Sequence, residues 1–310
     1  MTPSPHLPVL LDECIAGLRI RPEGTYVDGT LGGGGHSFEI ARRLTTGRLI
    51  GVDRDENALR AAGERLRPFG ERVILVKSNF DRLGEILDEL GVDLADGMLF
   101  DLGVSSPQLD EASRGFSYMA DAPLDMRMDV SGSLTAREIV NEWPEEELKR
   151  ILYTYGEERY APRIAAAIAR RRQDREIEST LELAELIRSA MPAAARREKQ
   201  HPAKRSFQAI RIAVNDELGS VERMLASAPD RLKKGGRLCI ISFHSLEDRL
   251  VKQAIHKRVD GCTCPKSLPV CVCGFKQTLK TVGGVITASE DELARNPRAR
   301  SAKLRVAERV

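Results

Sequence analysis

No stretch of this sequence is long and apolar enough to cross a membrane as a helix, which takes about 20 consecutive apolar residues. The opening residues, Met1-Thr-Pro-Ser-Pro-His6, also lack the basic and apolar regions of a signal peptide. Repeats and low-complexity tracts are absent as well. These absences predict a cytoplasmic protein with no membrane partner. Hydrophobic residues make up 42% of the 310 positions, which is enough for a large core.

Two common nucleotide-binding motifs are missing from the glycine-rich segment at 25–37. A P-loop ends in Gly-Lys-Ser/Thr, whereas these glycines run into His36. A dinucleotide fingerprint needs G-x-G-x-x-G, which no register of Gly29 to Gly35 supplies. Both absences disfavour a nucleotide-dependent oxidoreductase. They favour a nucleoside cofactor without a pyrophosphate, of which S-adenosylmethionine is the commonest. A glycine-rich surface loop is the alternative.

The same segment has the pattern of a strand, a tight turn and a helix. A short apolar run ends in Asp28, five glycines follow within seven residues, and a helical pattern begins near Phe38. A second apolar run ends in Asp53. An acid at that position is typical of a ribose-binding carboxylate. Glycines have no Cβ, so a ligand can lie directly against the backbone of 32–35.

The order of apolar runs predicts the fold class. Four strands are expected at 25–28, 49–53, 73–77 and 97–101, separated by helices at 36–44, 56–66 and 82–90. A fifth strand at 236–243 follows a sharp turn at 232–236, and an antiparallel pair at 277–282 and 302–307 encloses a helix at 289–294. Strands that alternate with helices form a parallel sheet. We therefore predict an α/β fold, the Rossmann-like sheet with a late antiparallel hairpin of class I S-adenosylmethionine-dependent methyltransferases.

A mostly helical segment separates the fourth strand from the fifth. Helices are expected at 135–141, 144–153, 161–172 and 180–190. We predict that residues 109–205 form an inserted substrate-recognition domain. Residues 1–108 and 206–310 then form the S-adenosylmethionine-binding domain, with helices over 206–216 and on to 232 leading back to the sheet.

The net charge of +2 hides an asymmetry between the halves of the chain. Residues 1–160 carry 18 Lys and Arg against 29 Asp and Glu, a formal charge of −11. Residues 161–310 carry 30 against 17, a formal charge of +13. A basic half favours a polyanionic partner, with nucleic acid the leading candidate. A set of solvated helix faces is the alternative.

The end of the fourth strand carries the candidate catalytic residues, Asp101 and Ser105-Ser106-Pro107. Chemistry in open α/β sheets lies at the carboxyl ends of the strands. Amino-methyltransferases place a short Asp/Asn/Ser-Pro-Pro-aromatic element there, which this segment matches in part. Acceptors that hold both N–H groups of an exocyclic amine free its lone pair for attack. Phe116 or Tyr118 would supply the aromatic wall, and an ordinary Ser-Pro turn is the alternative.

Further candidates follow other strands. Phe80 would stack on the adenine, with Asn79 beside its edge, although an aromatic residue there is also typical of a core. His36 would touch the methionine end of the cofactor or cap the following helix. His244, with Glu247 and Asp248, is a second-line candidate that would either contact the target base or fix the local loop.

The densest basic cluster lies where the chain returns from the predicted insertion. It consists of Arg196, Arg197, Lys199, Lys204, Arg205 and Arg211. With 170–172 and the tail at 295–300, these cations would suit a phosphate backbone. Each run alone is more typical of a solvated face.

Four cysteines form a separate pattern, C-x-C followed six residues later by C-x-C: Cys262, Cys264, Cys271 and Cys273. Four soft ligands so close together are typical of structural zinc. Structural zinc usually uses the longer C-x₂₋₄-C spacing, however, so the spacing favours a reduced, proline-containing loop over a zinc site. A disulfide is disfavoured in a cytoplasmic protein. We assign no metal ligands from the sequence.

Many of these segments together resemble the bacterial 16S rRNA cytosine-N4 methyltransferase family. The resemblance is carried by motifs from His6 to Arg305, including 28–37, Gly51-Val-Asp-Arg-Asp55, 101–108, Arg114-Gly-Phe-Ser117, 123–128, Tyr155-Gly-Glu-Glu158 and 242–249. It implies methylation of N4 of a cytosine in the decoding region of 16S rRNA, with S-adenosylmethionine as the cofactor. It also implies cofactor contacts from Gly34, Gly35, His36, Asp53, Phe80, Asp101 and Gln108.

Several alternatives remain open at this point. A DNA amino-methyltransferase and a non-catalytic rRNA-binding assembly factor are the alternative functions. The partner is 16S rRNA, either naked or within the small ribosomal subunit, and the chain is a monomer or a homodimer. The family supplies no general base, so the catalytic assignment of Asp101, Ser106 and Pro107 rests on chemistry.

Overall fold

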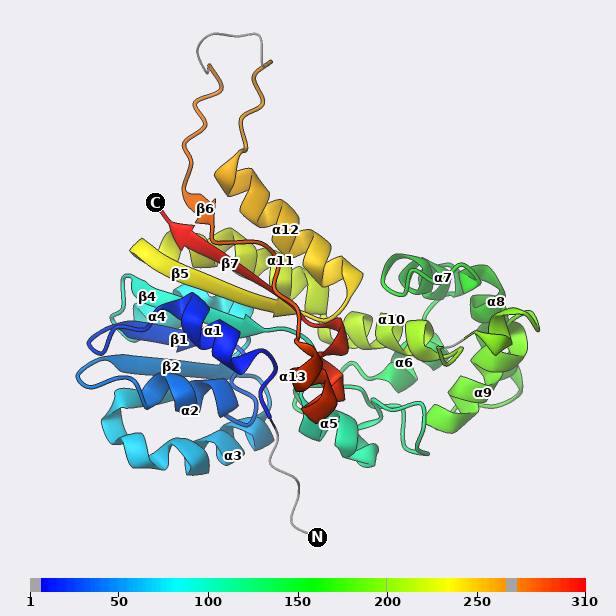
Figure 1. The fold of residues 1–310 in the computed structure, drawn as a ribbon. Helices are drawn as coiled ribbons and strands as arrows, with labels where there is room; N and C mark the ends of the chain where they lie inside the picture. The colour runs from blue at the N-terminus through cyan, green and yellow to red at the C-terminus, as the bar shows by residue number, and fades with distance from the viewer. Residues whose placement is uncertain (1–6, 199, 266–271) are drawn as a thin grey trace. The chain divides into compact units, whose positions relative to one another are not determined.

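The computed structural model describes residues 7–198, 200–265 and 272–310 (Figure 1). The chain divides into two compact units. One combines Met1–Gly103 with Leu218–Val310, and we call it the sheet unit. The other, Val104–Glu217, is the helical unit. Within the described parts of the chain, no helix combines the length and the apolar character that crossing a bilayer requires.

The sheet unit is built on seven strands in the order β3-β2-β1-β4-β5-β7-β6. They are β1 Thr25–Asp28, β2 Arg48–Asp53, β3 Val73–Lys77, β4 Ala95–Asp101, β5 Leu232–Ser242, β6 Leu279–Thr281 and β7 Lys303–Arg309. The first five pair in parallel, whereas β7 runs antiparallel to both β5 and β6. The predicted class I methyltransferase fold, with its late antiparallel hairpin, is confirmed. The strand order reverses between β1 and β4, where open α/β sheets bind ligands.

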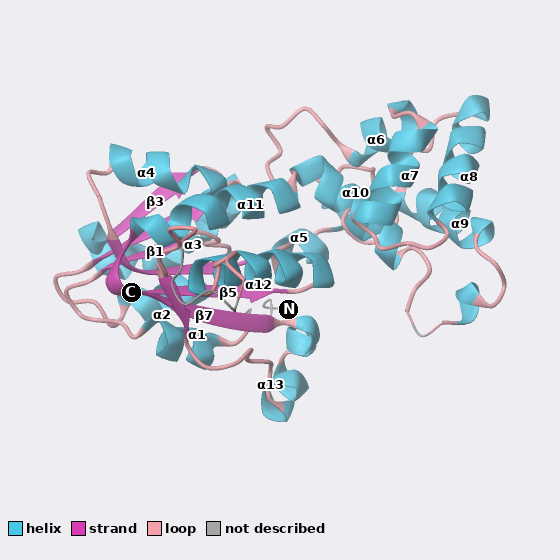
Figure 2. Cartoon of the chain, turned by 90° about the horizontal axis from the view of Figure 1, so that it is seen from above, coloured by secondary structure: helices cyan, strands magenta, loops and turns pink. Residues whose placement is uncertain are grey.

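Helices cover both faces of this sheet. They are α1 Leu11–Leu18, α2 Gly35–Ala41, α3 Glu56–Leu66, α4 Leu83–Glu89, α11 Glu217–Ser227, α12 Ser245–Val259 and α13 Glu290–Arg295. Figure 2 shows α4 and α11 on one side of the strands and α1 and α2 on the other. Successive strand residues point to opposite faces, so Met98 and Phe100 enter the cluster with α4 and α11, and Leu99 enters the cluster with α1 and α2.

Two features of the sheet unit differ from the sequence expectations. Helix α1 was not predicted, and left-handed residues bound it at Leu10 (φ 53°) and Arg19 (φ 52°). The expected turn at 232–236 is an irregularity inside β5 and not a boundary. Leu232 pairs with Ala95 while Arg237 pairs with Gly97, so β5 holds three extra residues between the two pairs.

The helical unit contains α5 Ser106–Asp110, α6 Ala136–Glu142, α7 Glu145–Thr154, α8 Ala161–Asp174, α9 Thr180–Ala190 and α10 Lys204–Asn215. The helices predicted at 135–141, 144–153, 161–172 and 180–190 are confirmed within a residue or two at most ends. The Thr135 side chain and Glu138 form a reciprocal capping box that fixes the start of α6. Apolar faces of α6 to α10 form one core.

Asn215, the last residue of α10, connects that helix to the loop at 126–128. Its Oδ1 accepts a hydrogen bond from Met128 N at 2.7 Å, and its Nδ2 donates to Met126 O at 2.7 Å. Met126 has a left-handed backbone (φ 61°), so the loop depends on outside partners for its shape. Because Asn215 is buried, water does not replace these hydrogen bonds when they are lost.

Asn215→Ala should therefore lower the free energy of unfolding by about 2–4 kcal/mol, because each buried group left unpaired costs about 1–3 kcal/mol. Chemical denaturation followed by circular dichroism measures this change. Asn57→Ala removes an exposed side chain and should change stability by less than about 0.5 kcal/mol. An Asn215 variant as stable as wild type would show that these bonds contribute nothing.

Candidate active site at the carboxyl ends of the parallel strands

Asp53, at the end of β2, holds the glycine-rich loop that follows β1. Its Oδ2 accepts a hydrogen bond from Gly32 N at 2.8 Å, and its Oδ1 accepts one from Asp55 N at 2.9 Å. Burial raises the pKa of Asp53, although both hydrogen bonds oppose that shift. The carboxylate predicted to bind ribose thus also fixes the loop beside it. Each oxygen keeps a second lone pair for a ligand hydroxyl.

Different neighbours explain why each position of this loop is a glycine. A Cβ on Gly34 would lie 3.1 Å from the Ala62 side chain, and one on Gly35 would lie 2.4 Å from Pro8. These two positions must be small because α3 and the N-terminal segment pack against them. A Cβ on Gly33 would meet nothing within 4 Å. Gly33 is therefore the position where a ligand can approach the backbone, one residue before the predicted pair.

His36 lies inside the first turn of α2, whose N-cap is Gly34, so His36 does not cap the helix. Its ring is buried, with Nε2 3.0 Å from Val9 O and Nδ1 3.9 Å from Asp101 Oδ2. The structure thus places His36 against Asp101, two residues that the sequence analysis assigned separately to the site.

Two carboxylates lie at the ends of β1 and β4: Asp28 is fully buried, and Asp101 is partly buried. Asp28 accepts hydrogen bonds from Ser37 Oγ at 2.7 Å and from Thr30 N at 3.2 Å, and burial raises its pKa to about 6. Asp101 N donates to Thr30 Oγ1 at 2.5 Å. Burial raises the pKa of Asp101 well above its usual range, and the charges of Asp28 and Glu247 add to the shift.

One oxygen of Asp101 is the strongest sign of a ligand at this edge. Asp101 Oδ1 is buried and accepts no hydrogen bond within the described residues. A buried acceptor left unpaired is costly, so such atoms in folded proteins usually serve a bound group. The geometry therefore suits a ligand that donates an N–H or O–H at the end of β4.

Asn79, which precedes Phe80 at the end of β3, presents a second acceptor of this kind. Its Nδ2 donates to Ser220 Oγ at 2.9 Å, while its Oδ1 is buried and accepts no hydrogen bond within the described residues. Ser220 Oγ in turn lies 3.3 Å from Asp81 Oδ2, an atom that Arg223 also contacts. Because Asp81 only accepts, Ser220 donates to it and keeps a lone pair for Asn79. This chain of bonds orients the amide.

The Phe80 ring packs edge-on against Phe100, with ring centres 5.9 Å apart and planes at 70°. It is only partly buried, at the margin of the cluster that contains Phe100. Phe80 thus does both of the things that the sequence left open: it contributes to a core and keeps part of its surface exposed. Together with Gly33, Asp53 and Asp101, it lies after one of four adjacent parallel strands.

The residues after β5 have local structural roles. His244 is the N-cap of α12, and its Nδ1 accepts a hydrogen bond from Glu247 N at 3.4 Å. The Glu247 carboxylate accepts from His244 N at 3.3 Å, which completes a capping box, and it also accepts from Phe243 N at 2.8 Å. Asp248 pairs with Arg305 Nε at 2.7 Å. The sequence left two roles open for these residues, contact with the target base or fixing of the local loop. These contacts match the second role.

The remaining site residues belong to the helical unit. Ser105 is the N-cap of α5, and its N–H donates to Gln108 Oε1 at 3.1 Å. Gln108 is buried and Pro107 is exposed. Phe116 is packed in the core of the helical unit, and Tyr118 stacks on His201 with ring centres 4.5 Å apart. Both proposed wall residues are therefore engaged within their own unit.

The predicted basic cluster is only partly available to a polyanion. Arg211 forms a bidentate ion pair with Glu217 at 2.8 and 2.9 Å, both side chains largely buried, so it does not serve as a phosphate contact. Arg196 donates to Met191 O and Ser189 O. Lys204 and Arg205 are exposed on the first turn of α10. Lys199 lies outside the described residues.

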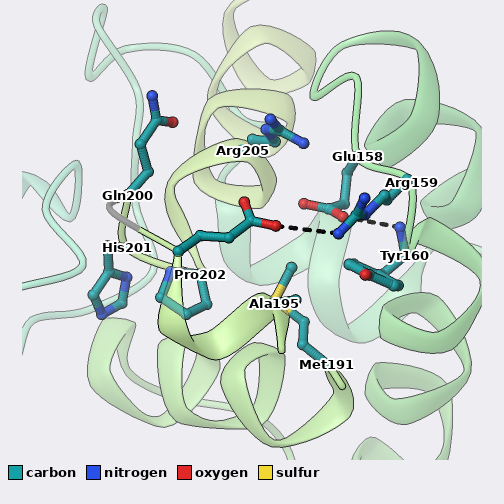
Figure 3. Close-up of a pocket in the computed structure, with 10 residues that line it drawn as sticks. Glu158, Arg159, Tyr160, Met191, Ala195, Gln200, His201, Pro202 and Arg205 are labelled. Atoms are coloured by element: carbon teal, nitrogen blue, oxygen red, sulfur yellow. Dashed lines mark hydrogen bonds and ion pairs between the residues drawn. The ribbon is translucent and has the colours of Figure 1, made fainter. Parts of the chain in front are cut away.

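Arg205 also lines a pocket within the helical unit. Figure 3 shows Glu158, Arg159 and Tyr160 on one side of it and Gln200, His201 and Pro202 on the other. Arg159 Nη2 lies 3.1 Å from Glu198 Oε1, and its guanidinium lies 4.7 Å from the centre of the Tyr160 ring. An acid already neutralises Arg159, so this pocket is not a strong anion site.

Asp28 provides a pH test of the buried carboxylates. Its folded pKa of about 6 exceeds the unfolded value of 3.8, so the folded protein loses stability as pH rises and Asp28 ionises. Asp28→Asn removes this titration. The free energy of unfolding of wild type relative to that variant should fall by up to about 3 kcal/mol between pH 4 and 7.

Denaturation at a series of pH values measures this difference, and Asp93→Asn, at an exposed position, is the matched control. The charge of Asp28 also raises the pKa of Asp101, so ionisation of the two carboxyl groups together lowers the stability of the folded protein as pH rises. A difference between wild type and the Asp28 variant that does not change with pH would contradict the assignment.

Comparison with known proteins places this geometry in a family. A model described as the MraW methylase family matches residues 3–310. Three relatives named "Ribosomal RNA small subunit methyltransferase H" are similar along almost their whole length. The chain is 58% identical over 302 residues to that of Symbiobacterium thermophilum, covering 97% of this chain and 95% of the relative. It is 55% identical over 308 residues to that of Heliobacterium mobile, covering 98% and 99%. It is 56% identical over 306 residues to that of Carboxydothermus hydrogenoformans, covering 98% of each.

The family assignment agrees with the sheet order, with the glycine loop after β1 and with the acid at the end of β2. The nucleoside cofactor favoured by the missing phosphate-binding motifs is the one this family uses. The chain therefore belongs to the MraW methylase family and is an S-adenosylmethionine-dependent methyltransferase.

Proposed function

We propose that the chain methylates the N4 exocyclic amine of a cytosine in the decoding region of 16S rRNA. The observation that carries this proposal is the near-complete match to relatives named as methyltransferases of small-subunit ribosomal RNA. The motifs that resemble the cytosine-N4 family support the choice of base and atom. The partner is then 16S rRNA or the small ribosomal subunit.

The residues at the carboxyl edge of the sheet fit S-adenosylmethionine. When bound, this cofactor supplies an electrophilic methyl group on a sulfonium sulfur. Asp53 would accept from the ribose hydroxyls, and Phe80 would pack on the adenine. Asn79 Oδ1 and Asp101 Oδ1, both buried without a partner in the described residues, would accept from polar hydrogens of the ligands. Gly34, Gly35, His36 and Gln108 complete the proposed contact set.

The chemical task of the site is to make a poor nucleophile attack. The N4 lone pair of cytosine is delocalised into the ring, so the free amine is almost planar. An acceptor that holds an N–H group favours the pyramidal geometry of the transition state. We assign this role to Asp101, assisted by backbone acceptors near Ser106 and Pro107. No proton has to leave before transfer, because the amine becomes acidic only as it gains positive charge.

The target base has to leave its stack to reach such a site, since an N4 amine within a helix is paired and enclosed. We assign recognition of the surrounding RNA to the helical unit, where four described cations of the predicted cluster are exposed: Arg196, Arg197, Lys204 and Arg205. Their charge would neutralise phosphates without conferring base specificity. Arg211 is excluded from this role by its pairing with Glu217.

The two cysteines buried in the sheet unit, Cys14 and Cys239, are unsuited to carbon methylation, which supports methylation of the amine. Methylation at C5 requires a thiolate that attacks C6. Cys14 and Cys239 are both buried in the sheet unit. Burial raises the pKa of Cys239 to about 12 and that of Cys14 well above its usual range, so neither thiol ionises near neutral pH.

The cofactor assignment predicts that Asp53→Ala weakens S-adenosylmethionine binding. A hydrogen bond to a charged group contributes about 1.5–3 kcal/mol, so affinity should fall roughly 10- to 150-fold. Isothermal titration calorimetry measures this loss, and Asp93→Ala, at an exposed acid, should bind as wild type does. Unchanged affinity in a folded Asp53 variant would remove the ribose assignment.

The catalytic assignment predicts that Asp101→Asn lowers turnover by about 10²–10³-fold at saturating S-adenosylmethionine, the range for removing one preorganised group at the reacting atom. Labelled cofactor is incubated with small subunits or naked rRNA, and the RNA is digested to nucleosides for mass spectrometry against standards. Asp93→Asn is the matched control.

N4-methylcytidine is the expected product. Formation of 5-methylcytidine would overturn the mechanism, and methylation of DNA in preference to rRNA would favour a DNA amino-methyltransferase. Binding of rRNA with no methyl incorporation at all would favour an assembly factor.

A further inference from the structure

Three of the clustered cysteines meet in a segment that the proposed reaction does not use. Cys262 and Cys264 follow the end of α12, and Cys273 precedes β6. Figure 1 shows two described stretches of chain extending beyond the end of α12. We call residues 260–265 the outgoing leg and residues 272–278 the returning leg. All three belong to the sheet unit, and none of them forms a disulfide with another described residue. Cys271, the fourth cysteine of the pattern, lies outside the described residues.

The three sulfur atoms have the spacing of a metal site. Each Sγ lies within 4.8 Å of the other two, and Cys262 Sγ and Cys273 Sγ are 3.7 Å apart. A tetrahedral zinc ion with Zn–S bonds of about 2.3 Å places its sulfurs about 3.8 Å from one another. The observed separation of this pair is therefore that of two ligands on one ion.

A hydrogen bond to the third sulfur is a separate observation that points the same way. Val272 N donates to Cys264 Sγ at 3.3 Å, across the two legs of the segment. A neutral thiol is a weak acceptor, whereas a metal-bound thiolate carries charge that a backbone N–H stabilises. The residue beside one candidate ligand thus supports another ligand on the opposite leg.

The base of the segment is already held in place. Thr278 N donates to Arg258 O at 3.0 Å, which joins the returning leg to the last turn of α12. A Cβ on Gly261 would lie 2.1 Å from Lys257 O, so the outgoing leg leaves the helix in close contact with it. Because both legs start from fixed points, bringing Cys262 and Cys273 together costs little additional chain entropy.

A disulfide accounts for less of this arrangement. A Cys262–Cys273 bridge would bring its two sulfurs to about 2.05 Å and would leave Cys264 and its hydrogen bond without a purpose. Three soft sulfurs around one point are typical of zinc, and no hard oxygen ligand accompanies them in the described cluster.

We propose that Cys262, Cys264 and Cys273 bind one Zn²⁺ ion as thiolates, separate from the methyl-transfer site. Each thiol loses its proton to solvent on binding, and no oxidation or reduction takes place. The ion joins the two legs beyond α12 and makes this segment rigid. The C-x-C spacing, which along the chain is short for zinc, is compatible with this site because Cys262 and Cys273, whose sulfurs are 3.7 Å apart, come from different legs.

The test is a titration of the reduced, metal-free full chain with Co²⁺, followed by displacement with Zn²⁺. We expect one Co²⁺ per chain, with intense visible bands of a tetrahedral ion and a thiolate-to-cobalt charge-transfer band, all abolished by one equivalent of Zn²⁺. Cys262→Ser, Cys264→Ser and Cys273→Ser should each lower Co²⁺ affinity at least about 100-fold, more than the loss of a supporting outer residue costs.

Cys14→Ala is the matched control, because it removes a buried thiol from the same unit and should leave the cobalt spectrum unchanged. Circular dichroism of each variant shows that it is folded, and S-adenosylmethionine affinity should be the same in all of them. Absence of cobalt binding, an octahedral spectrum without charge transfer, or a site that survives all three serine substitutions would overturn the proposal.

Discussion

The pairing of β1 with both β2 and β4 is the constraint on which the site depends. It places β1 at the centre of the parallel strands and brings the ends of β2 and β4 to its two sides. The loop after β1 then meets Asp53 from one strand through Gly32, and Asp101 from the other through Thr30. The sheet thereby makes neighbours of Asp28 and Asp101, which are 73 positions apart in the sequence.

Burial of Asp28 and of the Oδ1 atom of Asp101 has a cost in folding free energy at this edge of the sheet. Asp28 offsets part of it through Ser37 and Thr30, and its pKa still rises to about 6. Asp101 offsets less, because one of its oxygens is buried with no partner in the described residues. Perturbed acids that lie together at the carboxyl edge of a parallel sheet are typical of functional sites, since stability alone would favour apolar residues there. The cost is therefore best explained by what the edge binds.

The sequence was sufficient to predict the strands and their ends, because glycines and acids punctuate the apolar runs around Asp28, Asp53 and Asp101. It was insufficient where a distant contact decides the outcome. Gly35 is required by Pro8, and the orientation of Asn79 depends on Ser220, 141 residues away. Helix α1 escaped prediction because left-handed residues bound it in place of the usual capping side chains. Arg211 looked like part of a basic surface until its bidentate pair with Glu217 placed it inside the unit.

The cysteines show the same limitation of sequence-based prediction, because here the spacing along the chain disfavoured a site that the tertiary structure supports. Judged along the chain, each C-x-C pair is short for placing both sulfurs on one zinc ion, and the sequence alone therefore favours a reduced loop. In space the sulfurs of Cys262 and Cys273 lie 3.7 Å apart, and a backbone N–H from the second leg reaches Cys264 on the first. Spacing rules describe ligands that share one turn of backbone, whereas here two legs approach each other because α12 and β6 hold their bases. A sequence pattern that looks unsuited to a ligand can therefore suit it once tertiary structure supplies the partner strand.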